Sequence, residues 1–175
     1  KIIVVKYGGA AMTDRLLKEN FSRDIALMRL VGMKPVIIHG GGPQIGEELK
    51  KAGIDTKFEN GLRVTNKPTM NIVKKVLGTQ INNEIVRLIK QHGANSISFN
   101  HNNYQIIRAS KKSFQDGVDL GLVGNVDKVM TSELKTILNK GLIPVIAPIG
   151  KAKNNEYLNI LSLIHISEPT RRRGI

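Results

Sequence analysis

Three consecutive glycines, Gly40, Gly41 and Gly42, are the residues best suited to bind an anion. They follow the apolar run 36–38, whose lack of polar alternation is typical of a strand buried on both faces of a parallel sheet. Ligands bind outside the carboxyl ends of such strands, where the next helix presents free NH groups. Glycines there let the backbone approach an anion closely. We therefore expect an anion site here, with an ordinary tight turn as the alternative.

A second glycine-rich strand end lies at the start of the chain. The apolar run 2–5 leads into Lys6, Gly8 and Gly9. A lone glycine run would be interpreted as a turn, but two in one short domain, one of them beside a lysine, favour a phosphate as the anion.

A third candidate is Arg63, on the returning strand of a predicted hairpin. Asn60 and Gly61, within the segment 54–64, are the residues that a type I′ turn prefers. A guanidinium can hold a carboxylate by two parallel hydrogen bonds, and a hairpin beside the glycine loop could cover a small ligand. A solvated strand arginine is the alternative, and the spacing alone does not decide between the two.

The elements that must position these residues form a strand and helix alternation. An amphipathic stripe predicts a helix that begins at Thr13 or Asp14 and ends at Gly32, between the two glycine-bearing strands. Strand, helix and strand in so short a span predict a right-handed crossover and a parallel pair. Further helices are predicted over 45–52, over 70–91 with Thr65 or Asn66 as cap, and over 134–138 with Thr131 or Ser132 as cap. Further strands are predicted over 94–100, 104–109, 122–129 and 142–148.

Composition limits the classes of protein to consider. With 175 residues, 41% of them hydrophobic, the chain can form one domain with a sizeable core. No run approaches the roughly 20 apolar residues of a membrane span, and no signal peptide precedes the first strand. The absence of cysteine agrees with a reducing compartment, so we expect a cytoplasmic protein with no membrane partner. None of the four histidines has the spacing of a metal site, so we expect no metal held by protein ligands alone.

Taken together, the segments KYGG (6–9), HGGGPQ (39–44), NGLRVT (60–65), LVGNV (122–126) and LIPVIAPIG (142–150) resemble the amino acid kinase family. Within it they are most similar to the kinases that phosphorylate N-acetyl-L-glutamate, and NGLRVT after HGGGP is the specific signal. The resemblance covers residues 1–160, which correspond to the amino-terminal, substrate-binding half. It implies a truncated three-layer α/β sandwich around a mostly parallel sheet, and a homodimer or higher oligomer. It also implies ATP and Mg2+ as co-substrates and phosphorylation of the γ-carboxylate of N-acetyl-L-glutamate in arginine biosynthesis.

The resemblance assigns roles at the matching glycine-rich positions. Lys6 would stabilise charge on the phosphoryl group in flight, as electrostatic preorganisation does in phosphoryl transfer. The NH groups of Gly41 and Gly42 would hold the reacting carboxylate and phosphoryl oxygens. Three further residues would lie near the phosphates of ATP: Gly8, Gly9 and Gly40.

Roles toward the rest of the substrate follow from the same resemblance. Arg63 and Asn159 would hold the α-carboxylate of N-acetyl-L-glutamate, and the hairpin 57–64 would act as a lid. No covalent nucleophile is required, which suits a chain without cysteine or a Ser/His pair.

The sequence departs from the family after Ile160. There the pattern continues Asn-Ala-Asp, but this chain reads Leu161, Ser162 and Leu163, so the aspartate that would orient the catalytic lysines is missing. The ATP-binding half, with a second lysine, is missing as well. The string 161–171, LSLIHISEPTR, resembles the translation of a sequencing-library adapter, and we interpret 161–175 as a non-native tail rather than a strand with a basic end. We expect the 175 residues alone to be inactive, with ATP and Mg2+ bound largely through the missing half.

Two other functions stay open. One is a relative that phosphorylates carrier-protein-bound aminoadipate or glutamate, whose pocket must admit a protein. The other is a non-catalytic basic binding module, since the net charge is +13. The lysines are scattered over helix faces and only 4% of residues are aromatic, so we expect a small anionic substrate and no nucleic acid.

Overall fold

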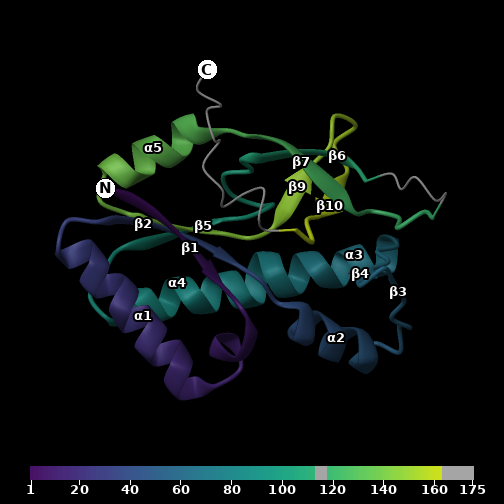
Figure 1. The fold of residues 1–175 in the computed structure, drawn as a ribbon, viewed down its shortest axis with the longest axis horizontal. Helices are drawn as coiled ribbons and strands as arrows, with labels where there is room; N and C mark the ends of the chain where they lie inside the picture. The colour runs from purple at the N-terminus through teal and green to yellow at the C-terminus, as the bar shows by residue number, and fades with distance from the viewer. Residues whose placement is uncertain (113–117, 163–175) are drawn as a thin grey trace.

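The centre of the fold is a four-stranded parallel sheet with the strand order β1-β2-β8-β5. We analysed a computed structural model, which describes residues 1–112 and 118–162 (Figure 1). The predicted tail 161–175 lies almost entirely outside the described residues, so its boundary stays a prediction. The four strands are β1 Ile2–Tyr7, β2 Lys34–His39, β5 Ser96–Phe99 and β8 Ile143–Ile146.

Helices cover both faces of this sheet and produce three layers. Helix α1, Arg15–Leu30, connects β1 to β2, and the Asp14 carboxylate caps it by accepting from the Leu17 NH at 2.8 Å. In Figure 1, α1 and α4 lie on one side of the sheet and α5, Thr131–Asn139, on the other. Apolar residues of β2 point alternately into both layers, Ile37 toward α1 and α4 and Val36 toward α5. The three-layer α/β prediction is confirmed.

The predicted helix over 70–91 is one continuous helix, but its middle part is π-helical, which the sequence did not predict. It consists of α3 Lys67–Val73, the π-helical segment η2 Lys74–Ile81 and α4 Asn82–Gln91. The Asn66 side chain caps it by accepting from the Thr69 NH, as predicted. The apolar stripe gave no sign of the π-helical segment, since a stripe records only which face is buried.

A second sheet, ordered β10-β9-β6-β7, lies beside the first and is mostly antiparallel. The sequence placed strands over 94–100 and 104–109 with a polar turn between them. Both strands exist, but they lie in different sheets, because the Asn100 side chain accepts from the NH groups of residues 102 and 103 and redirects the chain. The strands of this sheet are β6 Ile107–Lys111, β7 Gly124–Val129, β9 Ile149–Lys151 and β10 Tyr157–Asn159.

A short helix and a hairpin follow β2. Helix α2 spans Gly42–Lys51, and the hairpin pairs β3 Phe58–Glu59 with β4 Leu62–Arg63. Asn60 and Gly61 have φ angles of 50° and 75°, the positive values of a type I′ turn, so the hairpin prediction is confirmed. The predicted cap of α5 is wrong: Thr131 is the first helical residue, and Met130 before it has no side-chain cap.

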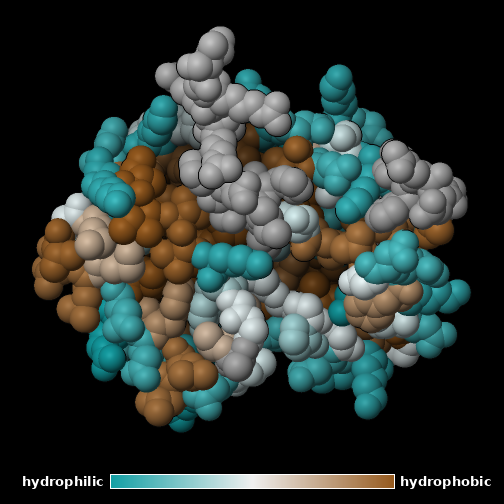
Figure 2. Space-filling view, in the orientation of Figure 1, coloured by the Kyte–Doolittle hydropathy of each residue, from teal (hydrophilic) through white to brown (hydrophobic). Residues whose placement is uncertain are grey.

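One part of the surface is apolar. Figure 2 shows apolar side chains gathered where α1 ends and the chain begins, and large exposed residues there include Ile2, Leu27, Leu30 and Val31. Strand β1 is an edge of the parallel sheet, so Ile2 and Val4 are half exposed. In the part of the chain that the structure describes, no helix has the length and apolar character to cross a membrane.

Candidate functional site

The triple glycine lies at the carboxyl end of β2, and its three residues have different surroundings. Gly41 has a φ of 154°, and a Cβ added to it would lie 2.6 Å from Ile81 Cδ1 and closer still to Leu77 Cδ2. The positive φ favours glycine at this position, and a Cβ would also displace the ends of these two side chains of the π-helical segment. A Cβ added to Gly42 would meet no described atom within 4 Å. Packing does not explain this glycine, and the first turn of α2 is open on this side.

The two glycine-rich turns lie next to each other. The register of β1 and β2 pairs Lys6 with Ile38 and Tyr7 with His39, and the Gly40 NH donates to the Tyr7 carbonyl at 2.8 Å. Gly9 has a φ of 65°, and a Cβ at Gly8 would meet nothing within 4 Å of the described structure. Parallel pairing thus places both predicted anion-binding turns at the carboxyl ends of two neighbouring strands.

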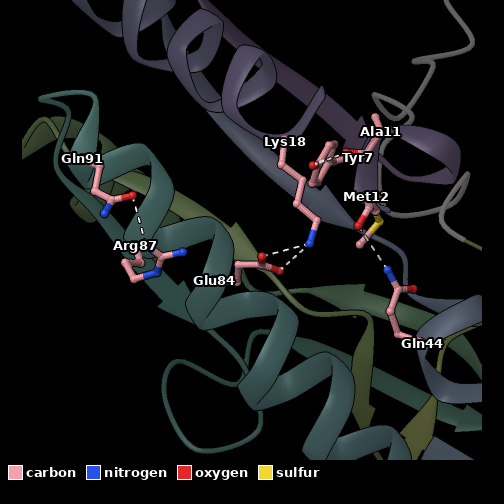
Figure 3. Close-up of polar contacts among 8 residues, drawn as sticks. All are labelled: Tyr7, Ala11, Met12, Lys18, Gln44, Glu84, Arg87 and Gln91. Atoms are coloured by element: carbon pink, nitrogen blue, oxygen red, sulfur yellow. Dashed lines mark hydrogen bonds and ion pairs between the residues drawn. The ribbon is translucent and has the colours of Figure 1, made fainter. Parts of the chain in front are cut away.

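Side chains fix the turn after β1 against α2, as Figure 3 shows. The Tyr7 hydroxyl donates to the Ala11 carbonyl at 2.6 Å, and Gln44 Nε2 donates to the Met12 carbonyl at 3.4 Å. Burial, with a smaller effect of Glu84, raises the pKa of Tyr7 to about 12, so its hydroxyl keeps the proton that this bond needs. Behind the turn, Lys18 of α1 and Glu84 of α4 form an ion pair at 2.9 Å.

Arg63 lies against the first turn of α2. Its guanidinium donates from Nη2 to the Gly42 carbonyl at 3.0 Å and from Nη1 to Thr56 Oγ1 at 3.3 Å, and it stacks over the Phe58 ring at 4.8 Å. The residue is only 7% exposed, and burial lowers the pKa of Arg63 from its usual value. Of the five NH donors of a guanidinium, these bonds use two and leave three for an anion. The structure thus removes the ambiguity left by the sequence: this arginine is not a solvated strand residue.

Asn159 is joined to Arg63 through one buried threonine. Asn159 Nδ2 donates to Thr65 Oγ1 at 3.2 Å, and Thr65 Oγ1 donates to the Arg63 carbonyl at 3.1 Å. Thr65 and Asn159, 94 positions apart in the sequence, are therefore in direct contact next to the backbone of Arg63. Asn159 and Thr65 are both buried, so their polar groups have fixed positions.

Lys6 is exposed and lies one residue before the Tyr7–His39 pair. Because paired residues of parallel strands point to the same face, its side chain leaves the sheet on the side of Ile38, which packs in the cluster that contains α5. The structure shows no contact between Lys6 and the glycine loop. What relates them is that both lie at the carboxyl ends of the paired strands β1 and β2.

Sequence reasoning missed a buried polar network behind the loop. His39 is fully buried and contacts the Gly40 carbonyl through Nδ1 at 2.9 Å and Asn82 Nδ2 through Nε2 at 3.1 Å. Asn82 is buried at the start of α4, and Ser98 and Asn100 of the β5 segment continue the network. A signal existed: Asn82 is a polar residue at the 82, 85, 89 spacing of the apolar stripe.

The groups at the glycine loop are backbone NH groups and a guanidinium, not a cluster of metal ligands. Residues 1–112 and 118–162 contain no group of three or more His, Cys, Asp or Glu side chains that could hold a metal ion. Backbone NH groups at a helix start and a guanidinium are, by contrast, the usual ligands of phosphate and carboxylate.

This fold and site define a class: three-layer α/β proteins with two glycine-rich strand ends side by side and a buried arginine at the start of the following helix. The sequence profile of the amino acid kinase family matches residues 1–164, and the chain belongs to this family.

Individual relatives agree with the profile. The chain is 49% identical to acetylglutamate kinase of Ruthia magnifica subsp. Calyptogena magnifica over 165 residues, which cover 91% of this chain and 56% of that protein. It is 45% identical to acetylglutamate kinase of Neisseria meningitidis serogroup C over 163 residues, with coverage of 91% and 55%. The chain therefore spans about half the length of the curated relatives it matches.

Solved structures agree as well. A structure from Streptococcus mutans superposes with a TM-score of 0.81 at 29% identity, over 91% of this chain and 63% of that one. N-acetylglutamate synthase from Neisseria gonorrhoeae, solved with coenzyme A and N-acetyl-glutamate, gives a TM-score of 0.80 over 95% of this chain and 37% of that one. At 19% identity, this second likeness shows the fold alone.

Proposed function

We propose that this chain forms the N-acetyl-L-glutamate-binding part of a kinase that transfers a phosphoryl group from ATP to the γ-carboxylate of that substrate, in arginine biosynthesis. The single observation that carries the proposal is the contact of Arg63 with the Gly42 carbonyl, at 3.0 Å. This contact supports the proposal because a guanidinium, which can bind one carboxylate, lies against a helix start, which suits a second anion. N-acetyl-L-glutamate is a small molecule with two carboxylates.

The chain's own residues suggest how the substrate is oriented. Arg63 and Asn159 bind the α-carboxylate, and Thr65 holds these two residues in fixed positions by its hydrogen bonds to both. The γ-carboxylate then lies at the NH groups of Gly41 and Gly42, at the start of α2, where the helix dipole favours negative charge. The hairpin 57–64 carries Arg63, so its closure and substrate binding are coupled.

Lys6, Gly8, Gly9 and Gly40 fit the phosphate end of the reaction. ATP, when bound, supplies the phosphoryl group, and open backbone at Gly8 and Gly9 leaves room for its oxygens. Lys6 is exposed at the same sheet edge, where its ammonium stabilises negative charge that develops on the phosphoryl oxygens. The described residues offer no carboxylate cluster for Mg2+, so its ligands would be phosphate oxygens and groups outside those residues.

Binding is the direct test, because the chain spans about half the length of its relatives. Calorimetry with N-acetyl-L-glutamate should show saturable binding that is lost in Arg63→Ala. In Arg63→Lys the affinity should fall about tenfold or more, because lysine keeps the charge but cannot form two parallel hydrogen bonds to a carboxylate. Arg108→Ala is the matched control, since Arg108 is an exposed strand arginine. Equal affinity in the Arg63 and Arg108 variants would contradict the proposal.

The same preparation tests the basic-module alternative. Affinity for duplex DNA that falls steeply with salt, together with no binding of N-acetyl-L-glutamate, would favour that alternative. We expect the reverse pattern, because the cationic side chain held at the described glycine loop is the single buried Arg63, which suits a small carboxylate rather than a polymer.

A further inference from the structure

The buried His39 lies directly behind the glycine loop, and its hydrogen bonds define where its proton is. The amide nitrogen of Asn82 can only donate, so His39 Nε2 accepts and the ring proton is on Nδ1. The orientation of Asn82 is itself fixed, because Nδ2 also donates to the Val145 carbonyl at 3.0 Å and Oδ1 accepts from the Ser98 hydroxyl. A flipped amide would place oxygen against the Val145 carbonyl oxygen. His39 therefore donates from Nδ1 to the Gly40 carbonyl at 2.9 Å.

The bond from His39 to the Gly40 carbonyl also orients the NH of the next residue, Gly41. The carbonyl of Gly40 and the NH of Gly41 belong to one planar trans peptide, so they point in opposite directions. Gly40 and Gly41 have no side chains that would favour one orientation of this peptide. A bond that fixes the carbonyl toward His39 also fixes the NH of Gly41 away from it.

We propose that His39 is a positioning residue, which directs the Gly41 NH toward a bound carboxylate or phosphoryl oxygen by holding the Gly40 carbonyl, with Asn82 selecting the required tautomer. The choice of ligand rests on the proposed function, while the tautomer and the peptide orientation do not. His39 itself touches no substrate in this mechanism.

Elements from three parts of the fold hold this arrangement. Asn82 begins α4 and contacts β8 through the Val145 carbonyl, and Ser98 lies on β5. Asn100 Nδ2 donates to Ser98 Oγ at 2.7 Å and to the Gly78 carbonyl of the π-helical segment at 2.6 Å. The network therefore ties the loop to the same segment against which Gly41 packs.

Burial keeps the imidazole in the required state. Loss of hydration in its fully buried site lowers the pKa of His39 to about 4. At neutral pH the ring is uncharged, so Nε2 remains an acceptor for Asn82 and Nδ1 remains the single donor.

The first measurement needs no variant. Nitrogen-15 NMR of the labelled chain should show His39 as the neutral Nδ1-protonated tautomer at pH 7, with the Gly41 amide shifting on addition of inorganic phosphate. An Nε2-protonated or charged ring would overturn the proposal, since Nδ1 of the first could not donate and the second could not accept from Asn82.

The second measurement replaces the donor that faces His39 Nε2, the Asn82 amide, with an acceptor. In Asn82→Asp the carboxylate can only accept, so Nε2 must carry a proton, and a ring that stays neutral then loses the Nδ1 bond to the Gly40 carbonyl. Nitrogen-15 NMR of this variant distinguishes that neutral ring from a doubly protonated ring, which the carboxylate also favours and which would keep the bond and bind like the wild type. We expect the tautomer to change and the affinity for N-acetyl-L-glutamate and inorganic phosphate to fall about tenfold. His39→Asn keeps a donor at the Nδ1 position and should bind within about threefold of the wild type, whereas His39→Leu should bind as poorly as Asn82→Asp.

A buried serine provides the matched control. Ser96, at the other end of β5, donates to the Val86 carbonyl at 2.9 Å and lies outside the network. Ser96→Ala should lower the stability but leave both affinities unchanged. If Asn82→Asp changes the tautomer yet binds like Ser96→Ala, the positioning role is wrong. If phosphate binding follows the prediction while N-acetyl-L-glutamate never binds, the proposed substrate fails and the positioning role stands.

Discussion

Replacing Gly42 with alanine separates binding from folding. Gly42 is the first residue of α2, it does not have a positive φ, and its added Cβ would meet no described atom within 4 Å. Alanine is more favourable than glycine in a helix by roughly 0.5–1 kcal/mol, so the free energy of unfolding should stay the same or rise by up to that amount. The new methyl group occupies the space in which we place the reacting carboxylate. We therefore expect an affinity for N-acetyl-L-glutamate at least tenfold lower, a loss of about 1.4 kcal/mol or more.

Gly41→Ala is its counterpart and should behave in the opposite way with respect to stability. Its Cβ would lie 2.6 Å from Ile81 Cδ1 at a φ of 154°, a region that L residues rarely adopt. Overpacking typically costs about 1–3 kcal/mol and backbone strain a similar amount, so we expect a loss of roughly 2–4 kcal/mol in the free energy of unfolding.

Urea denaturation followed by circular dichroism measures the stability of both variants, and calorimetry measures the affinity of Gly42→Ala. If Gly42→Ala binds N-acetyl-L-glutamate as tightly as the wild type, the open side of the loop is not the anion site. If Gly41→Ala is as stable as the wild type, the close contact with the π-helical segment does not constrain the loop.

Three further predictions test the supporting structure. The free energy of unfolding should rise with pH between about 4 and 6.5, by up to about 3 kcal/mol, because in this window the unfolded chain binds a proton at His39 that the folded chain excludes. His39→Asn should remove this contribution in urea melts at pH 4.5 and 7, and an unchanged slope would contradict it. Asp14→Ala should lose about 1 kcal/mol by the same assay, because it removes the cap of α1, and a change near zero would show the cap to be unimportant. Thr65→Val should cost about 1–3 kcal/mol and weaken N-acetyl-L-glutamate binding, since Asn159 and the Arg63 carbonyl lose their buried partner; normal binding would show that the link is not needed.

Local signals were enough to predict the elements that carry the glycines. The cap at Asp14, the apolar run before Gly40 and the Asn60–Gly61 turn each act within a few residues, so the sequence specifies them directly. Parallel pairing of β1 with β2 then followed from the short strand–helix–strand connection, and with it the proximity of the two glycine-rich turns.

The rest of the site depends on contacts between distant segments. Nothing near Asn159 indicates that it meets Thr65, and nothing near His39 indicates that Asn82 is its partner. The separation of β5 and β6 into different sheets similarly depends on distant pairing partners, β8 for the first strand and β7 and β9 for the second, and alternation of apolar residues does not record this. For the same reason the buried state of Arg63 could be found only from the folded structure.

The π-helical segment has a consequence for insertions and deletions in this region. A π-helical turn holds one residue more than an α-helical turn, so removing one residue from 74–81 would let this segment become α-helical with little rotation, whereas inserting one would rotate α4 by roughly 100° relative to α3. Asn82 would then leave His39, and the apolar stripe of α4 would turn away from the sheet. An insertion in this segment is therefore opposed at two places, by Gly41 packing on Leu77 and Ile81 and by the hydrogen bond at the start of α4.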